Sequence, residues 1–353
     1  MIEPSPLLRP ETGEDEPVAA HGALRPTKLA HFIGQETLCQ NLEIFAKAAQ
    51  ARQDALDHCL LAGPPGLGKT TLARIIAHEL DVGIRSTAAP MLTKTGDLAA
   101  ILTNLKPRDV LFIDEIHRLG PHMEEILYGA MEDFHLDLII GEGPAARAVR
   151  IPIAPFTLIA ATTRTGLLST PLRERFGVHL NFTLYPPETL VTILLQAAGL
   201  LQIALSKQAA HEIARRARGT PRIAHRLLRR VRDIAQHHAP DSEITAELAD
   251  NALQQLGVDD RGLDGLDREY LLCLADTYGG GPCGIEALAA TLGQKRDILE
   301  DVIEPFLLQQ RLIIRQPRGR MLAPQGWKYL DRTPIEQQAQ EQESLFDSEH
   351  KRR

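Results

Sequence analysis

The chain has 353 residues, of which 44% are hydrophobic and 24% are charged, and its formal net charge is −7. This length allows a sizeable core and exceeds one ordinary domain, so we expect about two or three domains. The negative net charge excludes a basic surface spread over the whole chain, so any contact with nucleic acid must come from local patches.

The cysteines and the apolar runs set further limits. Neither a CxxC pair nor a ligand-like spacing to histidine occurs among the four cysteines, Cys39, Cys59, Cys273 and Cys283, which argues against a disulfide framework and against a zinc site. No apolar run approaches the roughly 18 residues of a membrane span, and the first residues are acidic, unlike a signal peptide. We therefore expect a cytoplasmic protein with reduced thiols and no membrane contact.

Both ends of the chain are polar. Residues 1–21 are rich in acids and prolines, and residues 333–353 are mostly charged residues and glutamines. Such segments cannot bury enough apolar surface to fold. We predict that residues 1–21 form a flexible acidic arm and that residues 333–353 form a disordered tail.

Between residues 22 and 185, short apolar runs alternate with amphipathic stretches. Three of the runs predict buried parallel strands: 58–63, 109–115 and 156–163. Amphipathic segments such as 70–80 and 122–131 predict the helices between them. This alternation predicts an α/β domain with a parallel sheet.

After Tyr185 the pattern changes from strands to helices. Four segments have helical spacing and predict a small all-helical domain over 186–257: 188–200, 206–218, 221–238 and 244–256. Glycines then loosen the chain before a third domain at 258–332. That domain has predicted helices at 267–277, 285–291 and 296–309, followed by the strand LIIR (312–315) and a second strand after PRGR (317–320). Three helices and a two-stranded wing are typical of a winged-helix domain.

Residues 63–70, GPPGLGKT, match the phosphate-binding pattern GxxxxGK[ST] between a predicted strand and a predicted helix. Glycines such as Gly66 and Gly68 let the backbone curl so that N–H groups point at phosphate oxygens, and the following helix adds its positive end. We expect Lys69 to bridge the β- and γ-phosphates and the Thr70 hydroxyl to bind Mg²⁺. The motif therefore predicts ATP and magnesium as ligands.

An acidic pair, Asp114-Glu115, ends the second apolar run. A parallel strand delivers its last residues to the edge of the sheet where the phosphate loop lies, so we expect Asp114 to hold magnesium. Glu115 is then placed to orient and activate the attacking water, while phosphoryl transfer itself depends mostly on electrostatics. The alternative is two solvated acids at a strand end, which the upstream phosphate loop disfavours.

Two further features indicate an ATPase of the AAA+ class with a RecA-like sheet. Thr162 lies near the end of the run LIAATT (158–163), where a small polar side chain can sense the γ-phosphate and the water. Arg173 and Arg175 follow in the turn TPLRERFG (170–177). A guanidinium that one subunit supplies to its neighbour stabilises transition-state charge, an effect worth roughly 10³–10⁵ in rate. That these arginines only solubilise the surface stays an alternative.

Arg222 opens a later helix directly behind Gly219-Thr220-Pro221. Proline in the first turn fixes the backbone there, and we expect Arg222 to face the nucleotide. The same helix carries Arg226, Arg229, Arg230 and Arg232, which we interpret as a solvated face or a subunit contact.

From about residue 22 to about residue 330, the chain resembles the RuvB family, bacterial motors of Holliday junction branch migration. The stretches that carry the resemblance include GPPGLGKTTLA (63–73), FIDEIHRL (112–119), IGEGPAAR (140–147), RRARGTPRIA (215–224) and QPRGRM (316–321). The resemblance implies an AAA+ core, a helical lid and a winged-helix head that binds DNA.

The resemblance also implies which residues form the sites. Nucleotide contacts fall on Leu24, Arg25, Gly66, Gly68, Lys69, Thr70, Thr71, Glu132, Asp133, Phe134, Arg175, Tyr185 and Arg222. Arg175 is the first choice for the finger that acts on a neighbouring subunit, with Arg173 second. DNA contacts fall on Arg296, Arg315 and Arg320 of the head. The family commonly has an aromatic hydroxyl where Phe134 stands, so only backbone contacts to the nucleotide are expected at that position.

A predicted hairpin, residues 136–156, suggests a partner. Leu136, Leu138 and Ile140 alternate on one strand, and Val149, Ile151 and Ile153 alternate on the other, on either side of the turn GEGP. An apolar tip, Ile139, Ile140, Ala145 and Ala146, would mark a docking surface, and the family's partner is the junction-recognition protein RuvA. A hairpin buried between subunits of a ring is the alternative.

These features predict a motor that hydrolyses ATP between the subunits of a hexameric ring and pulls duplex DNA at four-way junctions, in a complex that also includes a RuvC-like resolvase. Its DNA binding should be independent of sequence and sensitive to salt. The alternatives are a clamp-loader or replication-initiator ATPase, and a nucleotide-gated scaffold that binds DNA and barely turns over. The tail peptide Gln342-Glu343-Ser344-Leu345-Phe346 also resembles peptides that dock on the sliding clamp, although a chance match of five residues is the simpler explanation.

Overall fold

The structure, a computed structural model, describes residues 25–140, 147–238 and 242–333. These residues divide into two compact units, one of residues 25–203 and 219–225 and the other of residues 204–218 and 226–333. Within the described ranges, no helix is long and apolar enough to cross a membrane.

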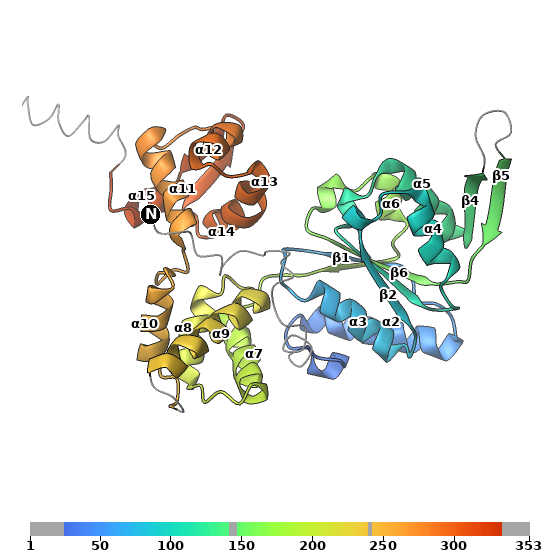
Figure 1. The fold of residues 1–353 in the computed structure, drawn as a ribbon, viewed down its shortest axis with the longest axis horizontal. Coiled ribbons are helices and arrows are strands. Elements are labelled where there is room, and N and C mark those ends of the chain that lie inside the picture. The colour runs from blue at the N-terminus through green and yellow to red at the C-terminus, as the bar shows by residue number, and fades with distance from the viewer. Residues whose placement is uncertain (1–24, 141–146, 239–241, 334–353) are drawn as a thin grey trace, which may run out of the picture. The chain divides into compact units, whose positions relative to one another are not determined.

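A five-stranded parallel sheet forms the centre of the first unit (Figure 1). The strands lie in the order β2-β3-β6-β1-β7. Their bounds are Cys59–Ala62 for β1, Ile84–Ala88 for β2, Val110–Asp114 for β3, Thr157–Thr162 for β6 and Val178–Asn181 for β7. The three predicted strands are therefore confirmed as β1, β3 and β6, and they are the three inner strands of the sheet.

The two edge strands, β2 and β7, were not predicted. The inner strands β1 and β6 are buried at every residue. By contrast, no residue of β2 is fully buried, and β7 alternates between buried and exposed residues. An edge strand pairs with one neighbour and leaves its other side unpaired, so it does not need the continuous apolar run of an inner strand, and neither edge strand has the pattern that identified the inner ones.

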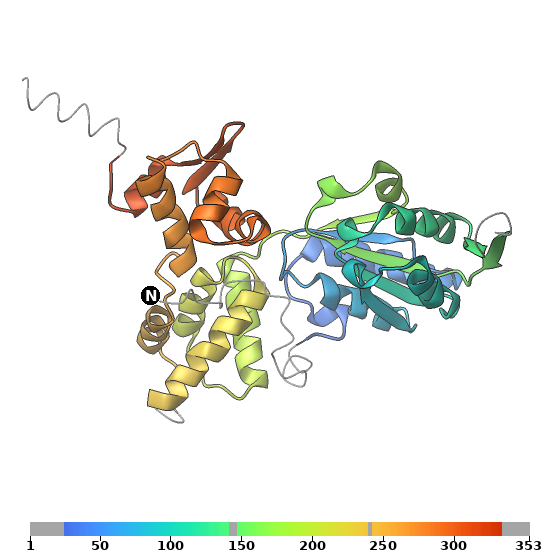
Figure 2. The same ribbon diagram turned by 45° about the horizontal axis from the view of Figure 1, so that its top comes forward.

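Helices cover both faces of this sheet (Figures 1 and 2). The helices α2 (Glu36–Arg52) and α3 (Lys69–Glu79) lie on one face, and α4 (Thr95–Thr103), α5 (Pro121–Glu132) and α6 (Thr170–Glu174) lie on the other. On the second face, Leu102 of α4 and Leu127 of α5 are fully buried in one core with Leu111 and Leu158 of the sheet. Burial of each such leucine stabilises the folded state by about 1.5–3 kcal/mol. This layered packing fixes the sheet edge on which the phosphate loop lies.

The predicted hairpin is present as β4 (His135–Ile140) and β5 (Arg147–Pro152), which pair antiparallel. The register sets Leu136 against Ile151, and both contact the core under α5. Outside, Asp137 and Arg150 form a cross-strand ion pair with two hydrogen bonds of 2.8 and 3.0 Å. The turn 141–146 and the side chains of Ile139 and Ile140 lie outside the described part, so the apolar tip stays a prediction.

All four helices predicted after Tyr185 are confirmed. The helix α7 (Pro187–Leu200) belongs to the first unit, and α9 (Pro221–His238) begins in the first unit and continues in the second. In the second unit, α8 (Lys207–Arg216) packs against α10 (Ala246–Gln255). The side chain of Arg216 is fully buried, and its guanidinium bonds Glu212, Asp250 and Asp260 together with the Asp259 carbonyl.

The rest of the second unit is a winged-helix fold. Its helices are α11 (Gly265–Leu272), α12 (Ile285–Leu292), α13 (Arg296–Ile298), α14 (Glu304–Gln309) and α15 (Pro324–Tyr329), and its wing is β8 (Ile313–Gln316) with β9 (Gly319–Leu322). The helix predicted at 296–309 is interrupted by a π-helical stretch, Leu299–Ile303. Pro305 follows at the start of α14, and proline has no N–H for the regular helical bond. The sequence did not predict α15.

Candidate functional site

The loop at residues 63–70 joins β1 to α3. Because β6 lies between β1 and β3 in a parallel sheet, the carboxyl ends of all three strands meet at one edge. The Gly63 amide donates a hydrogen bond of 3.1 Å to the Thr162 carbonyl, which ties the loop to β6. This edge therefore gathers the loop, Thr162 and Asp114.

Two glycines of the loop adopt backbone angles that disfavour any side chain. Gly66 has φ of 80° and Gly68 has φ of 98°, both in the left-handed region. A Cβ atom on Gly66 would lie 3.0 Å from the Cβ of Arg222, and one on Gly68 would lie 3.2 Å from the Phe32 ring. Since Gly68, the residue before α3, has no side chain to cap the helix, the first N–H groups of α3 are available to an anion.

The Lys69 side chain is only 7% exposed. Its ammonium donates hydrogen bonds of 2.7 Å to the carbonyls of Gly63 and Pro64. Burial lowers the pKa of Lys69 to about 8, and nearby Asp114 acts in the opposite direction. The loop thus holds a buried amine on carbonyl oxygens, at the position where the motif places phosphate.

Thr70 and Asp114 have the oxygen donors that magnesium requires. Both are half-buried, Thr70 in the first turn of α3 and Asp114 at the end of β3. One Asp114 oxygen accepts a hydrogen bond of 2.9 Å from the Glu115 amide. Hydroxyl and carboxylate oxygens are ligands of Mg²⁺ in phosphate sites, so the donor chemistry fits this ion.

Glu115 follows directly with φ of 51°, an uncommon angle for a residue with a side chain. Its carboxylate accepts a hydrogen bond of 3.0 Å from Arg118. No sequence motif singled out Arg118, although a spacing of three residues is one at which side chains meet on a helical turn.

Thr162 is 1% exposed, and its hydroxyl lies 3.0 Å from Nδ1 of His117. The same hydroxyl accepts a hydrogen bond of 3.0 Å from the Arg164 amide. Thr163, the next residue, has the exposed side chain at this strand end. The structure therefore adds His117 and Thr163 to the residues of the site, and neither was predicted from the sequence.

Tyr185 and Arg222 lie at the phosphate loop. The Arg222 amide donates a hydrogen bond of 3.3 Å to the Gly66 carbonyl, and the Tyr185 hydroxyl donates one of 3.2 Å to the Leu67 carbonyl. Burial raises the pKa of Tyr185, which keeps the hydroxyl protonated as a donor. Partial burial lowers the pKa of Arg25, and the positive charges of Arg74 and Arg222 add to the effect. Arg25 thus belongs to the same basic cluster, and Arg74 is a further member that was not predicted from the sequence.

A second group of predicted residues surrounds Arg175, which is 22% exposed. Its guanidinium stacks on the Tyr128 ring at 4.3 Å from the centroid and lies 3.1 Å from the Glu132 carboxylate. Arg173, the second choice for the finger, is exposed. Asp133 and Phe134 line an open hollow of about 540 Å³ at the base of the hairpin. The contacts of these residues run among α5, α6 and the hairpin, whereas those of Lys69 and Tyr185 run to the phosphate loop.

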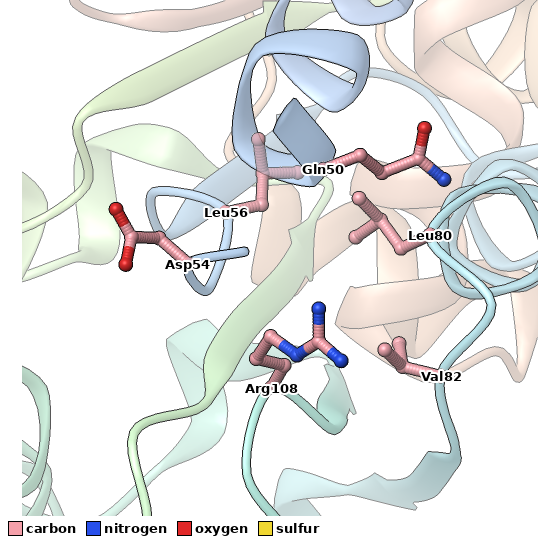
Figure 3. A pocket seen from close by; sticks show the side chains of 6 residues that line it. All are labelled: Gln50, Asp54, Leu56, Leu80, Val82 and Arg108. Atoms are coloured by element: carbon pink, nitrogen blue, oxygen red, sulfur yellow. The ribbon is translucent and has the colours of Figure 1, made fainter. Parts of the chain in front are cut away.

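Another pocket in the first unit carries none of this chemistry (Figure 3). It is lined by Gln50, Asp54, Leu56, Leu80, Val82 and Arg108. Its volume of about 10 Å³ suits at most one water molecule, and no predicted site residue lines it.

The three arginines predicted to bind DNA are all paired with acids of the head. Arg296 bonds Glu286 and Glu300, and Arg320 bonds Glu300 at 2.7 Å and Glu304 at 2.9 Å. Arg315 bonds Glu304 at 2.6 Å. Glu304 is fully buried and also accepts a hydrogen bond of 2.9 Å from the Tyr270 hydroxyl. The structure thus brings the arginines together through two glutamates, Glu300 and Glu304, whose role was not predicted from the sequence.

Two predicted features cannot be placed. Leu24 and the tail peptide 342–346 both lie outside the described residues. Thr71 is half-buried in the first turn of α3, beside Thr70.

Three family models match the chain in succession. They are described as the Holliday junction DNA helicase RuvB P-loop domain at residues 24–182, the RuvB AAA lid domain at 185–259 and the RuvB C-terminal winged helix domain at 260–331. The AAA+ core, lid and winged-helix head expected from the sequence are therefore confirmed.

Curated relatives and solved structures agree. The Holliday junction branch migration complex subunit RuvB of Paramagnetospirillum magneticum is 59% identical over 321 residues, which cover 91% of this chain and 92% of the relative. The RuvB subunit of Gluconobacter oxydans is 59% identical over 334 residues, which cover 94% of this chain and 93% of the relative. The Thermotoga maritima RuvB Holliday junction branch migration motor superposes with a TM-score of 0.81 at 48% identity, over 88% of this chain and 99% of that one. These matches favour the motor over a clamp loader, and the chain belongs to the RuvB family of Holliday junction branch migration motors.

Proposed function

We propose that the protein hydrolyses ATP at the edge formed by β1, β6 and β3, and that it uses the energy to translocate duplex DNA at four-way junctions. The observation that carries this proposal is the meeting of the buried Lys69, the uncapped start of α3, and the pair Asp114-Glu115 at that one edge. Phosphate recognition and water activation need these groups side by side.

Each residue has a distinct task in this proposal. Lys69 binds the β- and γ-phosphates, and Thr70 with Asp114 holds Mg²⁺, which neutralises phosphate charge when bound. Glu115 orients and activates the attacking water, and Thr162 senses the γ-phosphate through its position beside His117. Gly66, Gly68 and Thr71 contact phosphate, while Arg25, Tyr185 and Arg222 contact the nucleotide beside the loop.

We further propose that each site is completed by a neighbouring subunit of a homohexamer. Arg175 supplies the trans-acting guanidinium, with Glu132, Asp133 and Phe134 on the same surface. The proposal is supported by the grouping of Arg175 with Glu132, away from the hydrogen bonds of the phosphate loop. Arg173 remains the second choice, since it is exposed on α6, which ends directly before Arg175.

Arg296, Arg315 and Arg320 are proposed to hold the DNA backbone through the guanidinium edges that their glutamates leave available. Residues 22–185, 186–257 and 258–332 are proposed as the three domains, which the matched family ranges support. The hairpin 136–156 is proposed to dock a RuvA-like protein in a complex with a RuvC-like resolvase. The motor would act in the cytoplasm, where bacterial junctions lie. Docking of the tail on a sliding clamp stays the weakest of these proposals.

The proposal is tested by separating nucleotide binding from turnover. Glu115→Gln should bind ATP and Mg²⁺ like the wild type and lose turnover by about 10²–10⁴, because the phosphates are still held while the water loses its activator. Lys69→Ala should lose nucleotide binding itself. Both are measured by nucleotide titration and by ATPase and branch migration assays on a synthetic four-way junction.

The same assay separates the motor from a nucleotide-gated scaffold. A scaffold would show the same low turnover in the wild type and in Glu115→Gln, with or without the junction. Equally low hydrolysis by the two proteins would therefore reject the motor, whereas equally high hydrolysis would reject only the role of Glu115.

A further inference from the structure

The surroundings of Arg175 contain a side chain that none of the motifs includes. Tyr128 lies on α5, and its ring faces the Arg175 guanidinium at 4.3 Å. The distance is well within the roughly 6 Å over which a cation and an aromatic face attract each other. Both residues belong to the first unit.

Hydrogen bonds at the hydroxyl end of Tyr128 hold its ring in place. Its hydroxyl lies 3.0 Å from the Glu124 carboxylate and 3.1 Å from the Ser169 hydroxyl. Ser169 donates a hydrogen bond of 2.5 Å to the same carboxylate and accepts one from the Leu172 amide as the cap of α6. The ring is therefore fixed to the helix that ends directly before Arg175.

The contact with the ring uses none of the donors of the guanidinium. Arginine has five N–H donors along its edge. One bonds the Pro171 carbonyl at 2.8 Å and one points at Glu132 at 3.1 Å. Nε is buried and has no hydrogen-bond partner among the described residues. One N–H on each terminal nitrogen thus remains for another group.

We propose that Tyr128 is the positioning residue of the trans-acting arginine: its ring holds the Arg175 guanidinium in one plane and presents the remaining N–H edge to the nucleotide of the neighbouring subunit. The inference rests on the proposed function, in which Arg175 acts in trans. An arginine side chain without such a contact would have to adopt its active position anew in each cycle. A misplacement of about 1 Å costs on the order of a hundredfold in rate.

Two substitutions separate the ring from the hydroxyl. Tyr128→Leu removes the aromatic face and should lower the turnover number of the DNA-stimulated ATPase about ten- to a hundredfold, with nucleotide affinity unchanged because the phosphate loop is intact. Tyr128→Phe keeps the face and should stay within about threefold of the wild type. A turnover number of Tyr128→Leu within about threefold of the wild type would overturn the proposal, since the aromatic face would then not position Arg175.

Mixed rings identify which side of the interface is damaged. Tyr128→Leu subunits have an intact phosphate loop and a misplaced finger, so mixing with Lys69→Ala subunits, which have an intact finger, should exceed the sum of the two activities. Mixing with Arg175→Ala subunits should give no gain, because both partners lack a working finger. The opposite pattern, rescue by Arg175→Ala and not by Lys69→Ala, would mean that Tyr128 supports the phosphate loop of its own subunit, and the proposal would be wrong.

The mixture of Arg175→Ala with Lys69→Ala is the control for the underlying function. If this control gains activity while Tyr128→Leu gains none with either partner, the positioning role is rejected and the trans finger stands. If the control itself gains nothing in rings shown to contain both subunits, Arg175 does not act in trans. Ring formation is checked by mass photometry for every mixture.

Discussion

At the scale of single residues, the buried amine of Lys69, which we propose to bind phosphate, should link nucleotide binding to pH. Burial lowers the pKa of Lys69 to about 8, so in the nucleotide-free protein the amine loses its charge as the pH rises through that value. Phosphate binding requires the charged form. Binding above pH 8 must therefore take up a proton, because the phosphates stabilise the ammonium that burial disfavours.

We expect nucleotide affinity to be constant between about pH 7 and 8 and then to fall by about tenfold for each further pH unit. Isothermal titration in buffers of different ionisation enthalpy measures the affinity and the proton uptake together. Lys69→Arg is the matched control, because arginine stays charged over this range and should remove the dependence even where it weakens binding. A wild-type affinity that is level up to pH 9.5 would contradict the prediction.

At the scale of secondary-structure elements, the wing is joined to the helices of the head by charge. Arg315 on β8 and Arg320 on β9 both bond Glu304 at the start of α14. Glu304 is fully buried, so its carboxylate depends on these partners and on Tyr270. Arg315 and Arg320, which are predicted to bind DNA, therefore also stabilise the head. Replacing both at once would change DNA binding and the stability of the head together.

Single and double replacements should separate these tasks. Arg315→Ala leaves Glu304 with Arg320, so the head should stay folded, bind all duplex sequences more weakly and lose about one phosphate contact from the salt dependence. Arg315→Ala with Arg320→Ala should destabilise the head by about 3–5 kcal/mol, since a buried carboxylate loses both cations. Adding Glu304→Gln should recover much of that stability. Fluorescence anisotropy over a salt series and thermal unfolding measure the two effects, and an unchanged salt slope in Arg315→Ala would remove it from the DNA site.

At the scale of the whole molecule, a site shared between subunits makes activity depend on assembly. If Arg175 acts in trans, a dissociated subunit holds ATP without the group that stabilises the transition state. The ATPase rate per subunit should then rise with protein concentration between about 10 nM and 10 μM and level off when rings are complete, as mass action requires. Arg175→Ala should stay low at every concentration. A constant rate per wild-type subunit, over a range where mass photometry shows rings dissociating, would place the finger in cis.

Much of the candidate ATP site could be predicted from local sequence patterns. The loop at 63–70, the buried strand before Asp114 and the strand ending at Thr162 were all identified from continuous apolar runs and one glycine pattern, because inner strands of a parallel sheet must be buried on both faces. The edge strands β2 and β7 were not identified in this way, since each pairs with only one neighbouring strand and is not buried at every residue. Pro305 was present in the sequence, yet the π-helical stretch before it depends on how the head packs.

Side-chain partners between distant elements were decided only by the tertiary structure. The sequence by itself predicted the residues that we propose to handle phosphate, because Lys69, Thr70 and Asp114 belong to local motifs at the ends of neighbouring strands. It did not determine that Tyr128 stacks on Arg175, that His117 meets Thr162, or that Glu304 gathers Tyr270, Arg315 and Arg320. Tyr128 and Arg175 are far apart in the chain, and no periodicity of helix or strand relates them. Such pairs form where separate elements pack against each other, so their identity follows from the packing of the core and not from any local pattern.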